Sequence, residues 1–261
     1  MLLKLNLTNV REVVFEKESF SHLKVSNAST FQILINKFGR VRIATAAFSQ
    51  IEQADSSNFE LNLANGRKVV VSEYAFANLT QAVMAKFILF FNILESNVCL
   101  KSHTLDNVVQ AKNSTVRLTF LLNDANDLVL SENSLINIKQ SVNSFVQIYV
   151  LRSRRFVVAT NGVVNLTQSK SSSFEVWTSR GSFYVQASAF RRVIQDENAS
   201  IRIGFTASSA DSVYSQAVNS FVEFVSHANA ELVYDFTKGL NTFLLDAFFL
   251  KRTLLKKNFS R

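Results

Sequence analysis

The chain has 261 residues, a formal net charge of +8 and a pI of about 9.7. Its apolar fraction of 48% is sufficient for a buried core, and its single cysteine excludes an internal disulfide and a cysteine-based metal site. Its apolar runs fall short of the roughly 18 residues that a membrane-spanning helix needs, so we expect no membrane partner. The positive charge favours a polyanionic partner such as a nucleic acid.

The sequence matches itself after a shift of 115 positions (155 − 40). Arg40–Thr45 then aligns with Arg155–Thr160, and Ser56–Glu60 aligns with Ser171–Glu175. Self-similarity at a fixed offset indicates an internal repeat. Because only two copies are found, we interpret the repeat as a duplicated β-rich module and not as a solenoid.

The first module is predicted to span residues 1–97. Alternating or β-branched segments predict strands at 12–16, 31–37, 40–47, 58–63 and 68–71. The turn signals Lys37–Gly39 and Ala64–Gly66 predict antiparallel hairpins between them. Ser72 is a candidate N-cap for a helix over residues 73–94, where apolar residues recur at helical spacing.

Residues 98–129 are predicted to form a connector with one strand, Thr115–Leu122. The second module, residues 130–234, repeats the meander and carries an insertion of about 20 residues before its long helix, 210–228. Residues 235–261 are predicted to form a basic amphipathic helix. The predicted fold class is therefore α+β, with two modules that each consist of an antiparallel β-meander and a long helix.

Catalytic motifs are absent from the sequence, which contains no phosphate-binding loop, dinucleotide fingerprint, zinc-binding helix or nucleophile elbow. Glu60 and Glu175 occupy equivalent repeat positions and are interpreted as solvated strand residues. We therefore expect no enzymatic activity, no cofactor and no metal.

Basic and aromatic residues gather at the predicted strand ends. Because side chains alternate along a strand, Arg40 and Arg42 are expected to share one face. A basic groove with exposed rings is typical of single-strand nucleic-acid binding. The predicted binding residues are Lys37, Phe38, Arg40, Arg42, Arg67, Lys68, Arg152, Arg154, Arg155, Phe156, Lys251, Arg252, Lys256 and Lys257.

The order of the predicted elements, with the basic strand Phe38–Ile43 and the segment Gly66–Val70 leading into a helix, resembles the positive-cofactor-type coactivators that bind single-stranded DNA. Two such units in one chain resemble the Whirly fold, which plant Whirly proteins share with mitochondrial guide-RNA-binding proteins of kinetoplastids. The second copy has Ser182 and Phe183 in place of Arg67 and Lys68. The resemblance implies single-stranded nucleic-acid binding and assembly into oligomers.

The favoured function is single-stranded nucleic-acid binding, RNA more than DNA, in an organellar ribonucleoprotein. The expected location is the mitochondrion or another organelle, and the protein is not expected to be secreted. One alternative is a component of a divergent mitochondrial ribosome. Another is a structural or assembly protein, such as a virion component, that uses its β-modules for protein contacts. Salt dependence separates these alternatives, because phosphate binding weakens steeply as salt is added.

Overall fold

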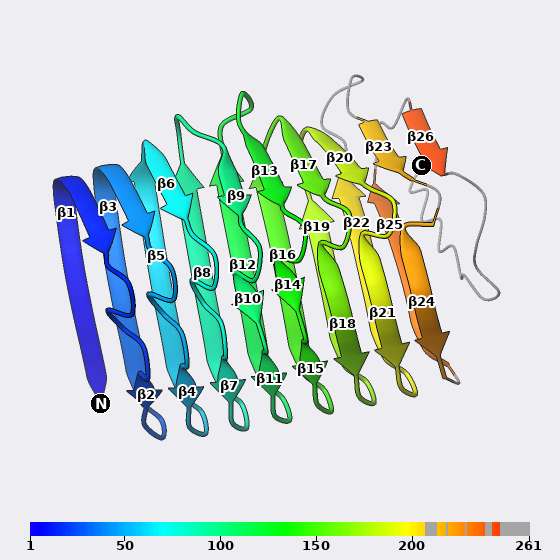
Figure 1. Ribbon diagram of the computed structural model, residues 1–261, viewed down its shortest axis with the longest axis horizontal. Coiled ribbons are helices and arrows are strands. Elements are labelled where there is room, and N and C mark those ends of the chain that lie inside the picture. The colour runs from blue at the N-terminus through cyan, green and yellow to red at the C-terminus, as the bar shows by residue number, and fades with distance from the viewer. Residues whose placement is uncertain (207–212, 218, 228, 238–241, 246–261) are drawn as a thin grey trace.

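The computed structural model describes residues 1–206, 213–217, 219–227, 229–237 and 242–245, with side chains described as far as residue 235. In this part of the chain the protein is a parallel β-solenoid of about eight coils, with 59% of residues in strands and no helix. Successive coils lie side by side in sequence order, from β1 at one end to β24 and β25 at the other (Figure 1).

Three parallel sheets make up the walls of the solenoid. Sheet A contains β1 (Leu2–Phe15), β3 (Thr30–Ile43), β5 (Asn58–Gly66), β6 (Lys68–Val71), β8 (Lys86–Ile93), β12 (Thr115–Leu122), β16 (Phe145–Arg152), β19 (Ser173–Thr178), β22 (Ser200–Thr206) and β25 (Glu231–Thr237). Sheet B contains β2 (Lys24–Val25), β4 (Glu52–Gln53), β7 (Thr80–Gln81), β10 (Leu105–Asp106), β11 (Val109–Gln110), β14 (Leu135–Ile136), β15 (Lys139–Gln140), β18 (Val163–Gln168), β21 (Phe190–Gln195) and β24 (Phe221–Ser226). Sheet C contains β9 (Val98–Leu100), β13 (Asp127–Leu130), β17 (Arg155–Val158), β20 (Ser182–Val185), β23 (Val213–Gln216) and β26 (Thr242–Leu245).

The coil length explains the repeat seen in the sequence. Thr30 pairs with Asn58 and Asn58 pairs with Lys86, so each of these coils contains 28 residues (58 − 30 and 86 − 58). The same ladder continues through Thr115 to Phe145. Thr30 and Phe145 are 115 positions apart (145 − 30), which is the offset of the self-match. The true repeat is therefore one coil, and the predicted duplication spans four coils.

The predicted α+β fold is wrong, because every assigned strand pair is parallel and the described residues contain no helix. The predicted hairpin turn at Lys37–Gly39 lies inside β3, and the one at Ala64–Gly66 forms the end of β5; Lys37 and Asn65 adopt φ values of 55°. Hydrogen-bonded ladders continue across the predicted boundaries at 97/98 and 129/130. Most of the predicted C-terminal helix, residues 246–261, lies outside the described residues.

The predicted helix over residues 73–94 is replaced by a turn and by strands β7 and β8. In β8 the buried side chains are Phe87, Leu89, Phe91 and Ile93, which alternate strictly with half-buried or exposed neighbours. The alternation of buried and outward-facing side chains has the period of two typical of a strand. It prevails over the apparent helical spacing because each coil buries one face of its strand in the interior. The predicted helix at 210–228 is likewise replaced by β23 and β24 in its described part.

Left-handed residues lie at corners between the sheets and at a bend within sheet B. Each central coil has three of them, as at Asn133, Asn137 and Asn143, whose φ values are 56°, 53° and 52°. A left-handed conformation costs most residues roughly 1–2 kcal/mol, and asparagine tolerates it better than other non-glycine residues. Asparagine is the commonest residue among the described left-handed positions. The asparagine content of the chain therefore has a structural cause.

A ladder of buried glutamines runs along the interior, one in each of six successive coils. Its members are Gln53, Gln81, Gln110, Gln140, Gln168 and Gln195. In four of them the side-chain Nε2 donates to Oε1 of the glutamine one coil earlier, each at 3.0 Å. The second Nε2 hydrogen is donated to a backbone carbonyl, as from Gln110 to Phe145 at 3.1 Å. Gln140 does not bond Gln110, whose buried Oε1 has no partner in the described structure.

Phenylalanines stack from coil to coil in the remaining core. The rings of Phe31, Phe59 and Phe87 lie 5.6 and 4.8 Å apart along one column. Phe156 and Phe183 stack at 4.7 Å in another column. Burial of one large ring contributes roughly 1.5–3 kcal/mol, so these columns add substantially to the cohesion between coils.

We expect the change Gln81→Ala to lower the free energy of unfolding by about 2–4 kcal/mol, because Gln53, Gln110 and the Thr115 carbonyl each lose a buried partner. Urea denaturation followed by circular dichroism measures this loss. Gln50→Ala is the matched control, since Gln50 is exposed and makes no side-chain hydrogen bond in the described structure. Equal midpoints for the two variants would contradict a stabilising role for the ladder.

Candidate functional surfaces

The first group of predicted binding residues lies on the outside of the solenoid. Arg40 in β3 pairs in register with Lys68 in β6. Arg40 and Arg42 are exposed while Val41 between them is fully buried, so the prediction that the two arginines share a face is confirmed. Nε of Arg40 lies 3.8 Å from Oε1 of Glu12. In the part of the chain that the structure describes, Arg42 and Lys68 make no ion pair.

Two more members of this group lie close by in the sequence but differ in surroundings. Lys37 is exposed at a left-handed position and makes no ion pair with any described residue. Arg67 is exposed, and its Nε lies 3.4 Å from Oε1 of Glu95. The structure therefore leaves Arg42, Lys68 and Lys37 as the uncompensated cations of the first group.

The second group of predicted arginines is held by aspartates of the preceding coil. Arg152 donates from Nε to Asp124 at 2.8 Å. Arg154 and Arg155 both donate to the carboxylate of Asp127, with shortest distances of 2.8 and 2.6 Å. The Arg154 hydrogen bond, followed by that of Arg155, lowers the pKa of Asp127 from 3.8 to about 2. These arginines stabilise the coil junction, where two carboxylates neutralise two of their three charges.

The predicted stacking residues Phe38 and Phe156 belong to the core. Their exposed fractions are 3% and 0%, so they cannot stack on unpaired bases and this part of the prediction is wrong. The ring of Phe38 occupies the space where a Cβ on Gly66 would lie. The remaining predicted residues, Lys251, Arg252, Lys256 and Lys257, lie outside the described residues.

The outward side of sheet A carries a connected polar network on three adjacent strands. Arg117 of β12 donates to Oε1 of Gln147 of β16 at 3.0 and 2.8 Å. Gln147 Nε2 donates to Glu175 of β19 at 3.0 Å, and the Tyr149 hydroxyl donates to the same carboxylate oxygen at 3.2 Å. Burial, followed by the Glu175 charge, raises the pKa of Tyr149. We call Arg117, Gln147, Tyr149, Glu175 and Trp177 the sheet A platform.

Trp177 is fixed on the platform by a glycine of the next coil. Gly204 pairs with Trp177, and a Cβ at Gly204 would overlap the indole ring. The indole therefore lies over the backbone of β22 while remaining half-exposed. The repeat pattern predicts a solvated Glu175, whereas its carboxylate accepts hydrogen bonds from Ser173, Gln147 and Tyr149. The strict alternation in 145–150 was the signal that could have placed Gln147 and Tyr149 on the outer face.

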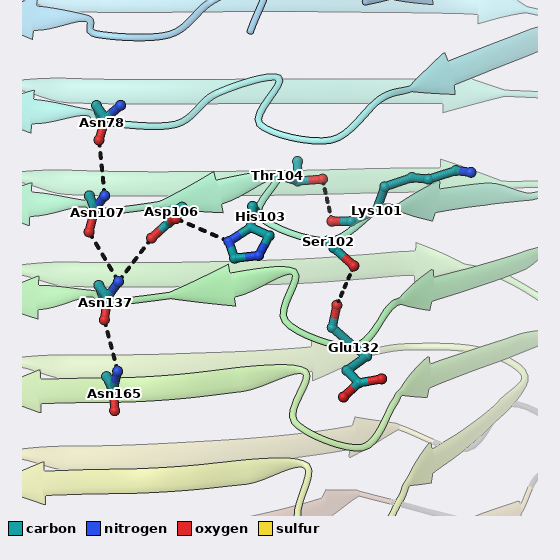
Figure 2. A network of polar contacts seen from close by, with 10 residues as sticks. All are labelled: Asn78, Lys101, Ser102, His103, Thr104, Asp106, Asn107, Glu132, Asn137 and Asn165. Atoms are coloured by element: carbon teal, nitrogen blue, oxygen red, sulfur yellow. Dashed lines mark hydrogen bonds and ion pairs between the residues drawn. The ribbon is translucent and has the colours of Figure 1, made fainter. Parts of the chain in front are cut away.

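Figure 2 shows the corner between sheets C and B, where a second polar network lies. Nδ1 of His103 lies 3.1 Å from Oδ2 of Asp106, and Asn137 donates to Oδ1 of the same aspartate at 3.0 Å. An asparagine ladder continues from Asn107 through Asn137 to Asn165, again by amide-to-amide bonds. Oδ2 of Asp106 binds His103 of the same coil and Oδ1 binds Asn137 of the next coil, so this network ties neighbouring coils together.

Comparisons with known proteins identify no relative: no family model, curated protein or solved structure matches the chain. The strand-then-helix modules on which the Whirly resemblance was based are not found in the described residues. No cluster of three potential metal ligands occurs in the described part. Likewise, that part contains no helix capable of crossing a membrane.

Because the pKa of Asp127 is lowered, its carboxylate should stabilise the fold above the unfolded-state pKa of 3.8, and this contribution should vanish as the pH falls through about 2. At neutral pH we expect Asp127→Asn to lower the free energy of unfolding by about 1–2 kcal/mol, since the half-exposed Arg154 and Arg155 are partly screened.

Denaturant titrations at several pH values measure this effect. The difference between the wild type and Asp127→Asn should shrink between pH values of about 4 and 2. Glu95→Gln, which removes the charge of a surface-exposed partner of Arg67, is the control and should change stability little at any pH. A pH-independent difference for Asp127→Asn would contradict the assignment.

Proposed function

We propose that the protein is a non-enzymatic structural or assembly protein whose sheet A platform binds the platform of a second copy. The observation that carries this proposal is the placement of opposite charges about one strand. Arg117 lies one coil before Gln147 and Glu175 lies one coil after it, in a single register ladder on the outer face. The arrangement is self-complementary.

A two-fold axis parallel to the strands and passing over β16 would set each Arg117 opposite the Glu175 of the second copy. Such an isologous interface uses the same patch on both copies, so two Arg117–Glu175 contacts form at once. Facing sheets pack roughly 10 Å apart, which long arginine and glutamate side chains can span. The internal network supports this geometry because Gln147 holds both charged groups in place before association.

The composition of the platform also supports a protein interface. Tyrosine, tryptophan and arginine are the residues most often found at the energetic centres of interfaces. Tyr149 and Trp177 are half-buried on the platform, and Phe145 and Leu151 of β16 are 37% and 43% exposed. A broad sheet with aromatic residues near the centre and charges beside them fits a partner that is itself a flat sheet.

Charge reversal tests the proposed interface. We expect Arg117→Glu and Glu175→Arg each to weaken self-association by about tenfold or more, because each places like charges together twice in the dimer. The double variant should restore association, since both contacts reform with exchanged partners. Sedimentation equilibrium over a range of protein concentrations measures the dissociation constants.

Lys139→Glu is the matched control for this experiment. Lys139 is exposed on sheet B, so Lys139→Glu changes the net charge by the same amount as Arg117→Glu without altering the platform. A monomeric wild type at all concentrations, or a double variant that associates no better than the single variants, would overturn the proposal.

A second candidate function, binding of single-stranded nucleic acid, is favoured by the cations of β3 and β6. Arg40, Arg42 and Lys68 lie on adjacent strands, and only Arg40 approaches an acidic residue among those described. Fixed neighbouring cations with a chain net charge of +8 attract phosphates. An RNA partner, a ribosomal role and an organellar location remain proposals that depend on this binding.

We expect a labelled single-stranded RNA to bind at roughly 50 mM salt, to be released at roughly 200 mM salt, and to bind the Arg40→Ala/Arg42→Ala/Lys68→Ala variant at least tenfold more weakly. Fluorescence anisotropy measures these affinities. The variant Arg152→Ala/Arg154→Ala removes ion-paired arginines and is expected to bind nearly as well as the wild type. The absence of binding at low salt would exclude this second function.

A further inference from the structure

A column of left-handed corner residues runs along the solenoid where the chain turns toward sheet B, after sheet A strands in the first three coils and after a sheet C strand in the fourth. Its first four members are Glu18, Ala46, Tyr74 and His103, with φ values of 61°, 56°, 55° and 58°. Three of these residues have long or cyclic side chains, whereas Ala46 has only a methyl group. The second coil therefore lacks the side chain that its neighbours place in this column.

A cavity of about 300 Å³ lies at this position. Its walls include Glu18, Ser49, Gln50, Tyr74 and Asn78, and Ala46 lies among them. Coils stack at roughly 4.8 Å, so Glu18 and Tyr74, two coils apart, are separated by roughly 10 Å. That separation leaves space for one ring between them.

Tyr74 presents one face of its ring to this space. The other face stacks on His103 of the next coil, with centroids 4.6 Å apart and planes within 9° of parallel. Because Tyr74 lies between Ala46 and His103 in the column, the face away from His103 is directed toward the cavity. The stacking fixes the ring orientation, and the side chain is 40% exposed.

The other cavity walls offer uncommitted hydrogen-bonding groups. Ser49 is only 5% exposed, yet its hydroxyl has no partner among the described residues. The side chains of His22 and Gln50 also form no hydrogen bond there, and the amide oxygen of Asn78 accepts from Asn107, which leaves the Asn78 Nδ2 hydrogens available. Several polar groups around one aromatic face suit a ligand with many hydroxyls more than an apolar ring.

We propose that this cavity binds a single saccharide ring. The C–H groups of the sugar pack on the open face of Tyr74, in the place left empty by Ala46. Gln50, Ser49 and Asn78 form hydrogen bonds with the ring hydroxyls, and the Glu18 carboxylate accepts from another. The site is separate from the sheet A platform, so sugar binding and the proposed self-association are independent of each other.

Saturation-transfer NMR on the intact protein tests the proposal with methyl β-D-glucopyranoside, methyl α-D-mannopyranoside, N-acetyl-D-glucosamine and L-fucose as probes. We expect at least one of these sugars to show transfer that is strongest at the ring hydrogens facing Tyr74. Phenol is included as a flat apolar ring. Binding of phenol alone, or of no probe at millimolar concentrations, would overturn the proposal.

Ala46→Tyr fills the empty place in the column and should abolish sugar binding. The backbone accommodates this change, because Tyr74 and His103 adopt the same left-handed conformation at equivalent positions. Ser188→Tyr is the control, since Ser188 occupies a left-handed corner of the same column several coils away and lies outside the cavity. Sugar binding that survives Ala46→Tyr would overturn the proposal.

A milder variant tests the site even if Ala46→Tyr does not fold. Gln50→Ala removes one amide from the cavity wall and should lower the affinity for the sugar by about threefold to tenfold, the usual effect of one lost neutral hydrogen bond. Circular dichroism and urea denaturation should show an unchanged fold for Gln50→Ala. Unchanged affinity in this variant would also count against the proposed site.

Discussion

Stacking of one coil on the next through hydrogen bonds is the interaction on which the rest of the molecule depends. The backbone ladders supply most of these bonds, and the buried glutamines extend them into the interior. A buried amide is costly without partners, but an identical amide one coil away satisfies it without a change of geometry. The glutamines from Gln53 to Gln195 therefore help to fix the register of neighbouring coils. A coil shifted in register would leave its buried glutamine without a hydrogen-bond partner.

The corners then determine what the surface can do. With only six glycines and no proline, the chain makes its corners from asparagine and from other residues held in the left-handed region. Side chains at equivalent corners are brought next to one another, as in the ladder from Asn107 to Asn165. The same stacking places Tyr74 against His103 and leaves the gap at Ala46. The proposed binding cavity on this edge therefore exists because one coil has a small corner residue, Ala46, where its neighbours have larger side chains.

Part of this arrangement was predictable from the sequence. The shared face of Arg40 and Arg42 followed from strand alternation, and the offset of 115 was a true register, although it spans four coils. The single-coil period was missed because few columns keep one residue type, apart from the buried glutamines and the asparagine ladder. The platform was not predictable, since Arg117, Gln147 and Glu175 lie 28–30 positions apart and meet only once the coil length is known. The pairing of Asp127 with Arg154 and Arg155 was hidden for the same reason.

The missing bond between Gln110 and Gln140 divides the interior ladder into two blocks of three amides. At the same junction the pairing of β12 with β16 shifts register after Phe120, and β11 meets β15 at a single residue pair. Repeat proteins owe their cooperativity to interfaces between neighbouring units. Among the junctions along the glutamine ladder, the one between the fourth and fifth coils is therefore the one without a side-chain bond in the interior. Under a force along the solenoid axis, the glutamine ladder would resist separation at every one of its junctions except this one.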